Sequence, residues 1–249
     1  MDIEISESAG VRYLHFGSHW IQGAMRLARP WALELDYTRE MMTALLLRPD
    51  TEWPKSVLLI GLGAASLTKF LHRYRPDAKL TVVEIDASVV HVARHSFKLP
   101  EESERLRLHI DDGASFIAAS QQRFDLILVD GFDENARTGM LDTLPFYLNC
   151  KARLSSNGLL VTNLLSKRKG VKKSMERLEE AFEGRAIAFP SCDSGNVVAF
   201  AATGNPIAHS LAELKTLAKQ LKAATDLNLL PTISRLEQAN RCPAAQLQL

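Results

Sequence analysis

Residues 57–86 read VLLIGLGAASLTKFLHRYRPDAKLTVVEID, and this stretch decides the fold. An apolar run leads into a small-residue turn (GLGAAS, 61–66), which is followed by a helical pattern and a second apolar run that ends in Glu84. This order predicts two parallel strands joined by a helix, a unit that binds a nucleoside at the carboxyl ends of its strands. Gly61 and Gly63 let the backbone approach a ligand, and Glu84 can accept hydrogen bonds from two ribose hydroxyls.

The glycine turn also narrows the kind of nucleoside. The third glycine of the dinucleotide fingerprint falls at Ser66, so the match is incomplete. This disfavours NAD and FAD, because their pyrophosphate needs a close approach of the helix. A cofactor without phosphates, such as S-adenosylmethionine or a derivative, fits the turn better. The alternative is an α/β domain whose turn only requires small residues.

Composition and charge exclude several classes of protein. The 249 residues are 46% hydrophobic and 24% charged, as in an ordinary globular protein, and the net charge is +1. We therefore expect no nucleic-acid partner, and no apolar run is long enough to predict a membrane partner. Three scattered cysteines and an acidic N-terminus without a signal peptide predict a cytoplasmic location. His91 and His95 have no evident third ligand, so we expect no metal ion.

The chain divides into three predicted parts. Residues 1–35 suggest a small antiparallel β-sheet domain with short strands, and residues 36–205 suggest the nucleoside-binding domain. Residues 206–249 contain an amphipathic helix, expected over 207–223, and a tail that we expect to be loose from Pro243.

The second part alternates strands and helices, which predicts an α/β, Rossmann-like, doubly wound sheet of seven strands with helices on both faces. Expected strands are 56–60, 79–84, 106–110, 124–129, 158–163, 185–189 and 196–202. Expected helices are 35–47, 65–74, 87–97, 113–120, 140–154 and 170–182. The last two strands are joined by a short loop and should form an antiparallel hairpin at one edge of the sheet.

Polar and small residues follow the expected parallel strands, at the edge where ligands bind in an open α/β sheet. In chain order they are Gly61 and Gly63, Glu84 and Asp86, Asp112 and Gly113, Asp130, and Asn163. An edge so rich in carboxylates suits a polyhydroxy nucleoside together with a cationic second substrate.

Two of these carboxylates have alternative interpretations. Asp112 can accept a hydrogen bond from an adenine amino group, but Asp is also favoured as a helix N-cap, and one residue can do both. Asp130 follows the buried strand FDLILV, so desolvation can raise its pKa and make it a base. The alternative for Asp130 is a residue that only forms the turn. Asp133 would help to hold a cation.

Taken together, these residues resemble the spermidine synthase (polyamine aminopropyltransferase) family. That family has a methyltransferase-like α/β domain behind a small N-terminal β domain. The resemblance covers roughly residues 10–202. The matching pieces are WIQ (20–22), ELDYTREMM (34–42), LLIGLG (58–63), VVEID (82–86), DDG (111–113), FDLILVDGFD (124–133) and LPFYLNCKARLSSNGLLVTN (144–163).

The resemblance implies transfer of an aminopropyl group from decarboxylated S-adenosylmethionine to a diamine such as putrescine. Gln22, Glu84 and Asp112 fall where the family contacts this cofactor. Asp130 falls at the base that takes a proton from the amine. Tyr37 and Asp133 fall where the family holds the polyamine. Relatives often form dimers, so the resemblance also implies a homodimer.

The chain departs from the family pattern mainly at the amine side. Ala64 replaces the acid of the glycine turn, residues 131–132 are Gly-Phe in place of Ser-Ser, and Asn163 stands where a Gln is expected among the substrate residues. Arg39 would repel a polyamine if it pointed inward. Two alternatives therefore remain: a methyltransferase that uses S-adenosylmethionine on a small acceptor, and a non-catalytic relative that binds a nucleoside or a protein partner.

Overall fold

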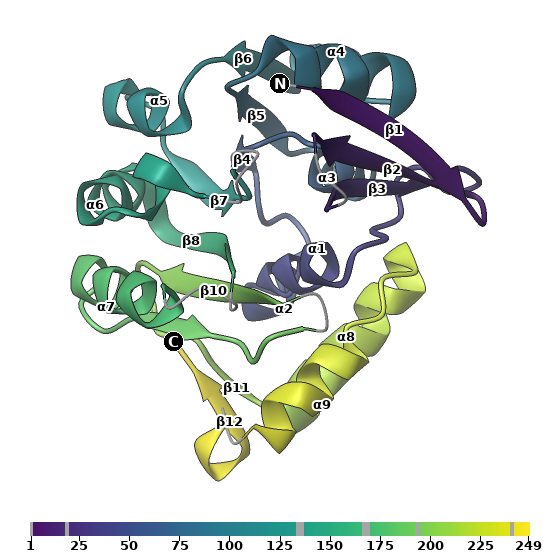
Figure 1. Cartoon of the computed structure of the whole chain (residues 1–249). Coiled ribbons are helices and arrows are strands. Elements are labelled where there is room, and N and C mark those ends of the chain that lie inside the picture. The colour runs from purple at the N-terminus through teal and green to yellow at the C-terminus, as the bar shows by residue number, and fades with distance from the viewer. Residues whose placement is uncertain (1, 18–19, 133–136, 166–169, 193–194, 240–241) are drawn as a thin grey trace.

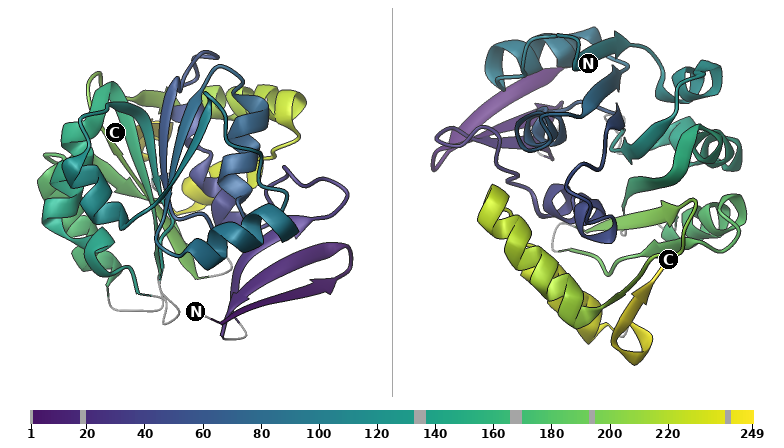
Figure 2. Two further views of the ribbon diagram at one scale, coloured as in Figure 1. Left: turned by 90° about the horizontal axis from the view of Figure 1, so that it is seen from above. Right: turned by 180° about the vertical axis from the view of Figure 1, so that it is seen from behind.

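The computed structural model describes residues 2–17, 20–132, 137–165, 170–192, 195–239 and 242–249. A large central sheet with helices on both faces forms the body of the molecule, and a small sheet from the N-terminus lies at its side (Figures 1 and 2). Among the described residues, none of the helices has the length and apolarity that a membrane crossing requires.

The central sheet has seven strands. Their spatial order is β6 (Leu106–Ile110), β5 (Lys79–Glu84), β4 (Ser56–Ile60), β7 (Phe124–Val129), β8 (Leu154–Leu165), β10 (Asn196–Ala202) and β9 (Ala186–Ala188). The first five strands are parallel, and β10 runs antiparallel to both of its neighbours. The predicted α/β class, the seven strands and the antiparallel hairpin at one edge are confirmed.

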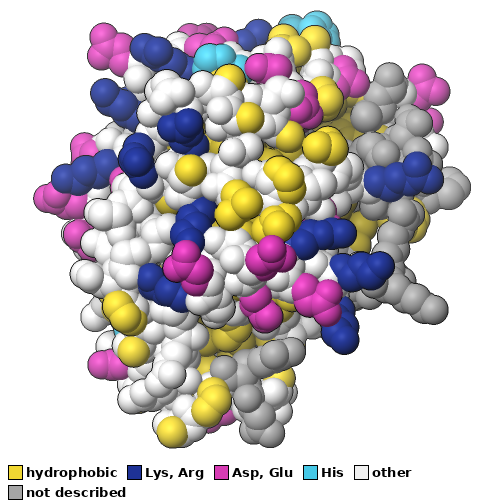
Figure 3. Space-filling model, turned by 90° about the vertical axis from the view of Figure 1, so that its left-hand side faces the viewer, with side chains coloured by type: hydrophobic (Ala, Val, Ile, Leu, Met, Phe, Trp, Pro, Cys, Tyr) yellow, Lys and Arg dark blue, Asp and Glu magenta, His cyan; other side chains and the backbone are white. Residues whose placement is uncertain are grey.

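Helices cover both faces of this sheet, as the alternation of strands and helices predicts. Leu58 and Ile60 point to the face that carries α5 (Gly113–Ala119), α6 (Leu144–Arg153) and α7 (Val171–Ala181). Their neighbours Val57 and Leu59 point to the other face, which carries α3 (Ser66–Tyr74) and α4 (Ala87–Ser96). On the outer surface of the α5–α7 layer, basic and acidic side chains are interspersed (Figure 3). This mixture is in keeping with a net charge of +1.

The small sheet contains β1 (Ile3–Ser8), β2 (Val11–Phe16) and β3 (Ile21–Arg26), paired antiparallel in that order. Its last strand lies directly against the glycine turn of the central sheet. A Cβ built on Gly23 would lie 2.6 Å from the Cβ of Ala64 and 2.9 Å from its backbone nitrogen. Only a glycine at position 23 permits this approach, which brings the N-terminal sheet to the edge where a ligand is expected.

The prediction of one helix over 35–47 is wrong, because the segment forms two short helices. α1 (Asp36–Met41) ends before Met42, and α2 (Ala44–Leu47) follows after Thr43. Between them the backbone N–H groups of Met42 and Thr43 bond to carbonyls three residues back, which tightens the turn. Nearly every residue from 37 to 47 is buried. Packing on all sides, and not one amphipathic face, sets the path of this segment.

The prediction for the C-terminal part is also wrong in detail. The expected helix starts later, as α8 (Leu211–Thr225), because Ser210 and Glu213 form a capping box there. A second helix, α9 (Leu230–Gln238), follows. The tail from Pro243 is not loose, since β12 (Gln246–Gln248) pairs with β11 (Ala208–Ser210) and the side chain of Leu247 is completely buried.

The turn after β4 has no room for a side chain at its first position. Gly61 has φ +94°, and a Cβ there would lie 2.2 Å from the backbone carbonyl oxygen of Asp130. The backbone N–H of Asp130 in turn donates to the carbonyl of Ile60. The backbones at the ends of β4 and β7 are therefore in close contact at the edge where ligands are expected.

This contact predicts that Gly61→Ala is much more damaging than Gly10→Ala. Both glycines have positive φ, but a Cβ on Gly10 meets open space. We expect Gly10→Ala to cost about 1–2 kcal/mol, the price of a left-handed L-residue, and to lower Tm by roughly 2–8 °C. Gly61→Ala should lower Tm several times as much in thermal unfolding. Equal losses in the two variants would contradict the close approach to Asp130.

Candidate active site

A cavity of about 910 Å³ opens at the carboxyl edge of the parallel strands, between the central sheet and the N-terminal sheet. It brings together most of the residues predicted from the sequence. Those that line it are Gln22, Tyr37, Gly61, Gly63, Glu84, Asp112, Gly113, Asp130 and Asn163. Asp86 is not among the lining residues, and Asp133 lies outside the described residues.

Glu84 is held in place by the backbone around it. The N–H of Leu62 donates to Oε2 at 2.9 Å, and the N–H of Asp86 donates to Oε1 at 3.0 Å. Burial raises the pKa of Glu84, whereas these backbone bonds lower it. Each carboxylate oxygen has a second lone pair, so the fixed side chain can still accept two hydrogen bonds. This arrangement suits a pair of ribose hydroxyls.

Asp86 and Asp112 both cap helices, but only one of them reaches the cavity. Asp86 accepts from the N–H of Ser88 at 2.8 Å at the start of α4, and the hydrogen bond from the Ser88 side chain lowers the pKa of Asp86. Asp112 accepts from the N–H of Ser115 at 2.8 Å at the start of α5 and also lines the cavity. The geometry of Asp112 is thus compatible with both of the roles left open by the sequence.

β3 crosses the glycine turn at Gln22 and Gly23. Gln22 lines the cavity because its neighbour Gly23 packs on Ala64, which is only 2% exposed. Position 64 therefore adds no carboxylate to this part of the cavity wall.

Asp130 is the centre of a hydrogen-bonded group at the other end of the cavity. The hydroxyl of Tyr37 donates to Oδ2 at 3.0 Å, and the side-chain amide of Asn163 donates to Oδ1 at 2.9 Å. Burial raises the pKa of Asp130, and the two hydrogen bonds lower it. Burial also raises the pKa of Tyr37, so its phenol stays protonated as a donor. A buried carboxylate held in this way can both bind a cation and accept a proton.

Sequence reasoning missed Asn196, whose side-chain amide donates to Oδ1 of Asn163 at 2.9 Å. The sequence pattern predicts ligand-binding residues where parallel strands end, and Asn196 does not follow such a strand. Because β10 is antiparallel, its first residue, and not its last, lies at the ligand-binding edge. The predicted hairpin was the signal that could have found this residue.

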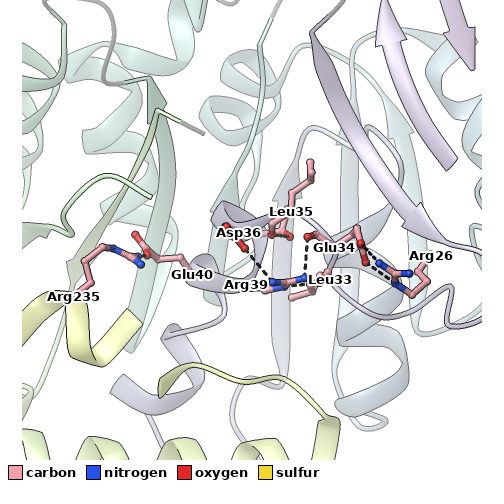
Figure 4. A network of polar contacts seen from close by, with 9 residues as sticks. Arg26, Leu33, Glu34, Leu35, Asp36, Arg39, Glu40 and Arg235 are labelled. Atoms are coloured by element: carbon pink, nitrogen blue, oxygen red, sulfur yellow. Dashed lines mark hydrogen bonds and ion pairs between the residues drawn. The ribbon is translucent and has the colours of Figure 1, made fainter. Parts of the chain in front are cut away.

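The Arg39 guanidinium is turned towards the backbone of the segment before α1 (Figure 4). Its guanidinium donates to the carbonyls of Leu33 at 2.8 Å and Glu34 at 2.9 Å, and it pairs with Asp36 at 3.0 Å. Arg39 is not among the residues that line the cavity. The repulsion of a polyamine that an inward-pointing Arg39 would cause therefore does not arise.

The helix that carries Tyr37 is also tied to the C-terminal part of the chain. Arg235 of α9 forms an ion pair with Glu40 of α1, whose side chain is 1% exposed (Figure 4). Arg235 also donates to the carbonyl of Pro190 at 3.3 Å. One guanidinium thus joins α1 to the segment between β9 and β10.

The chain is similar to known proteins along nearly its whole length. The spermine/spermidine synthase domain model matches residues 35–192. The polyamine aminopropyltransferase of Chromobacterium violaceum is 39% identical over 246 residues, which are 99% of this chain and 93% of that protein.

Two solved structures share the fold. A probable spermidine synthase from Corynebacterium glutamicum has a TM-score of 0.73 at 22% identity, and the match covers 88% of this chain and 83% of that one. Human methyltransferase-like protein 13 in complex with SAH has a TM-score of 0.68 at 24% identity, with coverages of 78% and 93%.

The identities with these two structures are too low to show more than the fold. The domain match spans more than half of the chain, and the Chromobacterium relative aligns along nearly the whole of it. This chain belongs to the spermine/spermidine synthase family.

Proposed function

We propose that the protein is a polyamine aminopropyltransferase, which moves an aminopropyl group from decarboxylated S-adenosylmethionine to a diamine such as putrescine. The observation that carries the proposal is the buried Asp130, held by Tyr37 and Asn163 in the same cavity as Glu84. The Chromobacterium relative, named a polyamine aminopropyltransferase, supports it.

The donor would occupy the half of the cavity around the glycine turn. Glu84 would accept from the ribose hydroxyls, and Gly61 and Gly63 would let the backbone approach the nucleoside. Asp112 and Gly113 would border the adenine, and Gln22 would lie near the sulfonium. No metal is needed, because the sulfonium already makes the neighbouring carbon electrophilic.

The acceptor would approach from the side of Tyr37 and Asp130. A diamine arrives protonated, since an alkylamine has a pKa of about 10, as Lys does. The Asp130 carboxylate would hold the ammonium group and take one of its protons. The freed amine lone pair then forms a bond to the carbon beside sulfur, and the carbon–sulfur bond breaks. Methylthioadenosine leaves as a neutral thioether, and the positive charge passes to the new secondary amine.

Alignment of the two substrates would also lower the barrier to the transfer. Displacement needs the amine nitrogen, the carbon and the sulfur in line, and holding reactants in such geometry can contribute several kcal/mol. Asp130 lies at the end of β7 and Glu84 at the end of β5, two strands joined through β4. Both ends of the reaction are therefore positioned by one rigid sheet.

A second candidate is an S-adenosylmethionine-dependent methyltransferase of a small acceptor. The observation in its favour is Ala64, whose methyl group would leave a donor carboxylate without a repelling acid at that position. The match to human methyltransferase-like protein 13 shows that the fold is compatible with this chemistry. A non-catalytic nucleoside-binding relative is the third possibility.

Several properties stay predictions from the sequence. We propose a homodimer, a cytoplasmic location, a small-molecule amine as substrate, and no nucleic-acid or membrane partner. Asp133 keeps its proposed role in holding the amine. Asp86 caps α4 and does not line the cavity, so we do not place it at the cofactor.

Calorimetry with the two donors separates the candidates. We expect decarboxylated S-adenosylmethionine to bind, and methylthioadenosine to be released when putrescine is added, because the site offers a base beside the nucleoside half. Tighter binding of S-adenosylmethionine than of its decarboxylated form would favour the methyltransferase. Binding of neither donor would leave the non-catalytic relative.

Replacing the base tests the chemistry. Asp130→Asn should lower kcat by about 10²–10⁴-fold, because the amide cannot accept the amine proton, and should leave donor affinity in calorimetry unchanged. Retained turnover would remove Asp130 from the role of base.

The pH dependence of kcat/KM also tests whether Asp130 must be ionised to act as the base. Because burial raises the pKa of Asp130, the carboxylate becomes protonated at a higher pH than an exposed Asp does. In the wild type, kcat/KM should fall as pH falls through this raised pKa. Tyr37→Phe removes a bond to the ionised form, so the acid limb should move to higher pH.

Glu84→Gln tests the ribose contact, with Asp86→Asn as the matched control. Loss of the charge at position 84 should weaken donor binding about 10–100-fold, the equivalent of one or two charge-assisted hydrogen bonds. The control should bind normally, because Asn also caps a helix and Asp86 is not among the cavity-lining residues. Equal losses in calorimetry would place Asp86 at the cofactor instead.

A further inference from the structure

A line of amides runs from the antiparallel strand β10 to the proposed base. Asn196 is 8% exposed and donates from Nδ2 to Oδ1 of Asn163, which is 3% exposed. Asn163 donates from Nδ2 to Oδ1 of Asp130. The two amide contacts are each 2.9 Å long, and they join three side chains from β10, β8 and the end of β7.

Every bond in this line runs in the direction that an ionised carboxylate requires. An ionised Asp130 can only accept, so Asn163 must turn its NH₂ group towards it. The carbonyl oxygen of Asn163 then faces Asn196, which must present its own NH₂ group. If Asn163 rotated by half a turn, its carbonyl oxygen would face the carboxylate, and two acceptors would repel each other.

We propose that Asn196 is a positioning residue for the aminopropyl transfer: it fixes the Asn163 amide so that an N–H, and not a carbonyl, faces Asp130. The base is thereby kept in the ionised form that can take a proton from the amine. This inference rests on the proposed function, because it assumes that Asp130 is the base. Among the described residues, hydrogen bonds link Asn196 to Asp130 through Asn163, so we expect its effect to pass through that amide.

In the part of the chain that the structure describes, the other polar groups around Asp130 form no hydrogen bond with the Asn163 amide. From α1, Tyr37 donates to the opposite oxygen, Oδ2. The charged side chains of the same helix, Asp36 and Arg39, pair with each other at 3.0 Å, and Glu40 pairs with Arg235. From the segment before β10, the thiol of Cys192 lies near the Tyr37 phenol.

The pKa of Asp130 can be measured directly by ¹³C NMR of the side-chain carboxyl carbon in the full chain, with Asp130→Asn to assign the signal. Asn196→Leu removes the donor at similar size, so Asn163 is free to rotate. We expect the Asp130 pKa to rise by about one unit, which is roughly the worth of one weakened hydrogen bond to a charge. The acid limb of kcat/KM should move by the same amount.

Two comparisons separate positioning from damage to the fold. In an Asn163→Leu background, Asn196→Leu should add no further shift, because the amide through which it acts is gone. Val197→Ala is the control on the same strand. Val197 packs in the core on the sheet face that carries α5–α7, with Leu58 and Ile60. Its truncation should therefore lower Tm and leave the Asp130 pKa unchanged.

An unchanged Asp130 pKa in Asn196→Leu would overturn the inference, and so would an equal shift in Val197→Ala. The NMR measurement does not depend on turnover. If the wild type transfers no aminopropyl group, the proposed function fails, and the titration still tells whether Asn196 controls the carboxylate.

Discussion

The site depends on one close contact, the backbone of Gly61 against the carbonyl of Asp130. Because β4 and β7 meet there without an intervening side chain, the nucleoside turn and the proposed base share one cavity. The same turn donates the N–H of Leu62 to Glu84, so the proposed ribose-binding acid is held by the turn that touches Asp130. A side chain at position 61 would separate the two halves of the reaction.

Much of this could be predicted from the sequence, since it follows from local pattern. The strand–turn–helix–strand unit ending in Glu84 and the carboxylate after FDLILV are readable residue by residue. Asn196 was not readable in the same way, because its position depends on the direction of β10 in the sheet. The break between α1 and α2 and the pairing of β12 likewise come from contacts between distant segments, which periodicity does not record.

Two residues that depart from the family pattern, Arg39 and Ala64, differ in how they affect the cavity. Arg39 is engaged with the backbone of Leu33 and Glu34, so it leaves the amine side of the cavity to Asp130 and its partners. Ala64 is different, because it is packed under Gly23 and still leaves the donor without an acid at that position. We therefore expect the residues near Ala64 to bear on the choice of donor, and Asp130 and its partners to bear on the proposed transfer step.

The ion pair between Glu40 and Arg235 has a consequence for the order of folding. The two residues are 195 positions apart, so their contact closes one of the longest loops in the chain. Contacts that close loops of this length form late, because the chain loses the conformational entropy of loop closure before it gains the energy of the contact. Until α9 arrives, Glu40 remains hydrated and α1 lacks its outer support. The helix that carries Tyr37 is thus expected to settle among the last elements, after the sheet that carries Asp130.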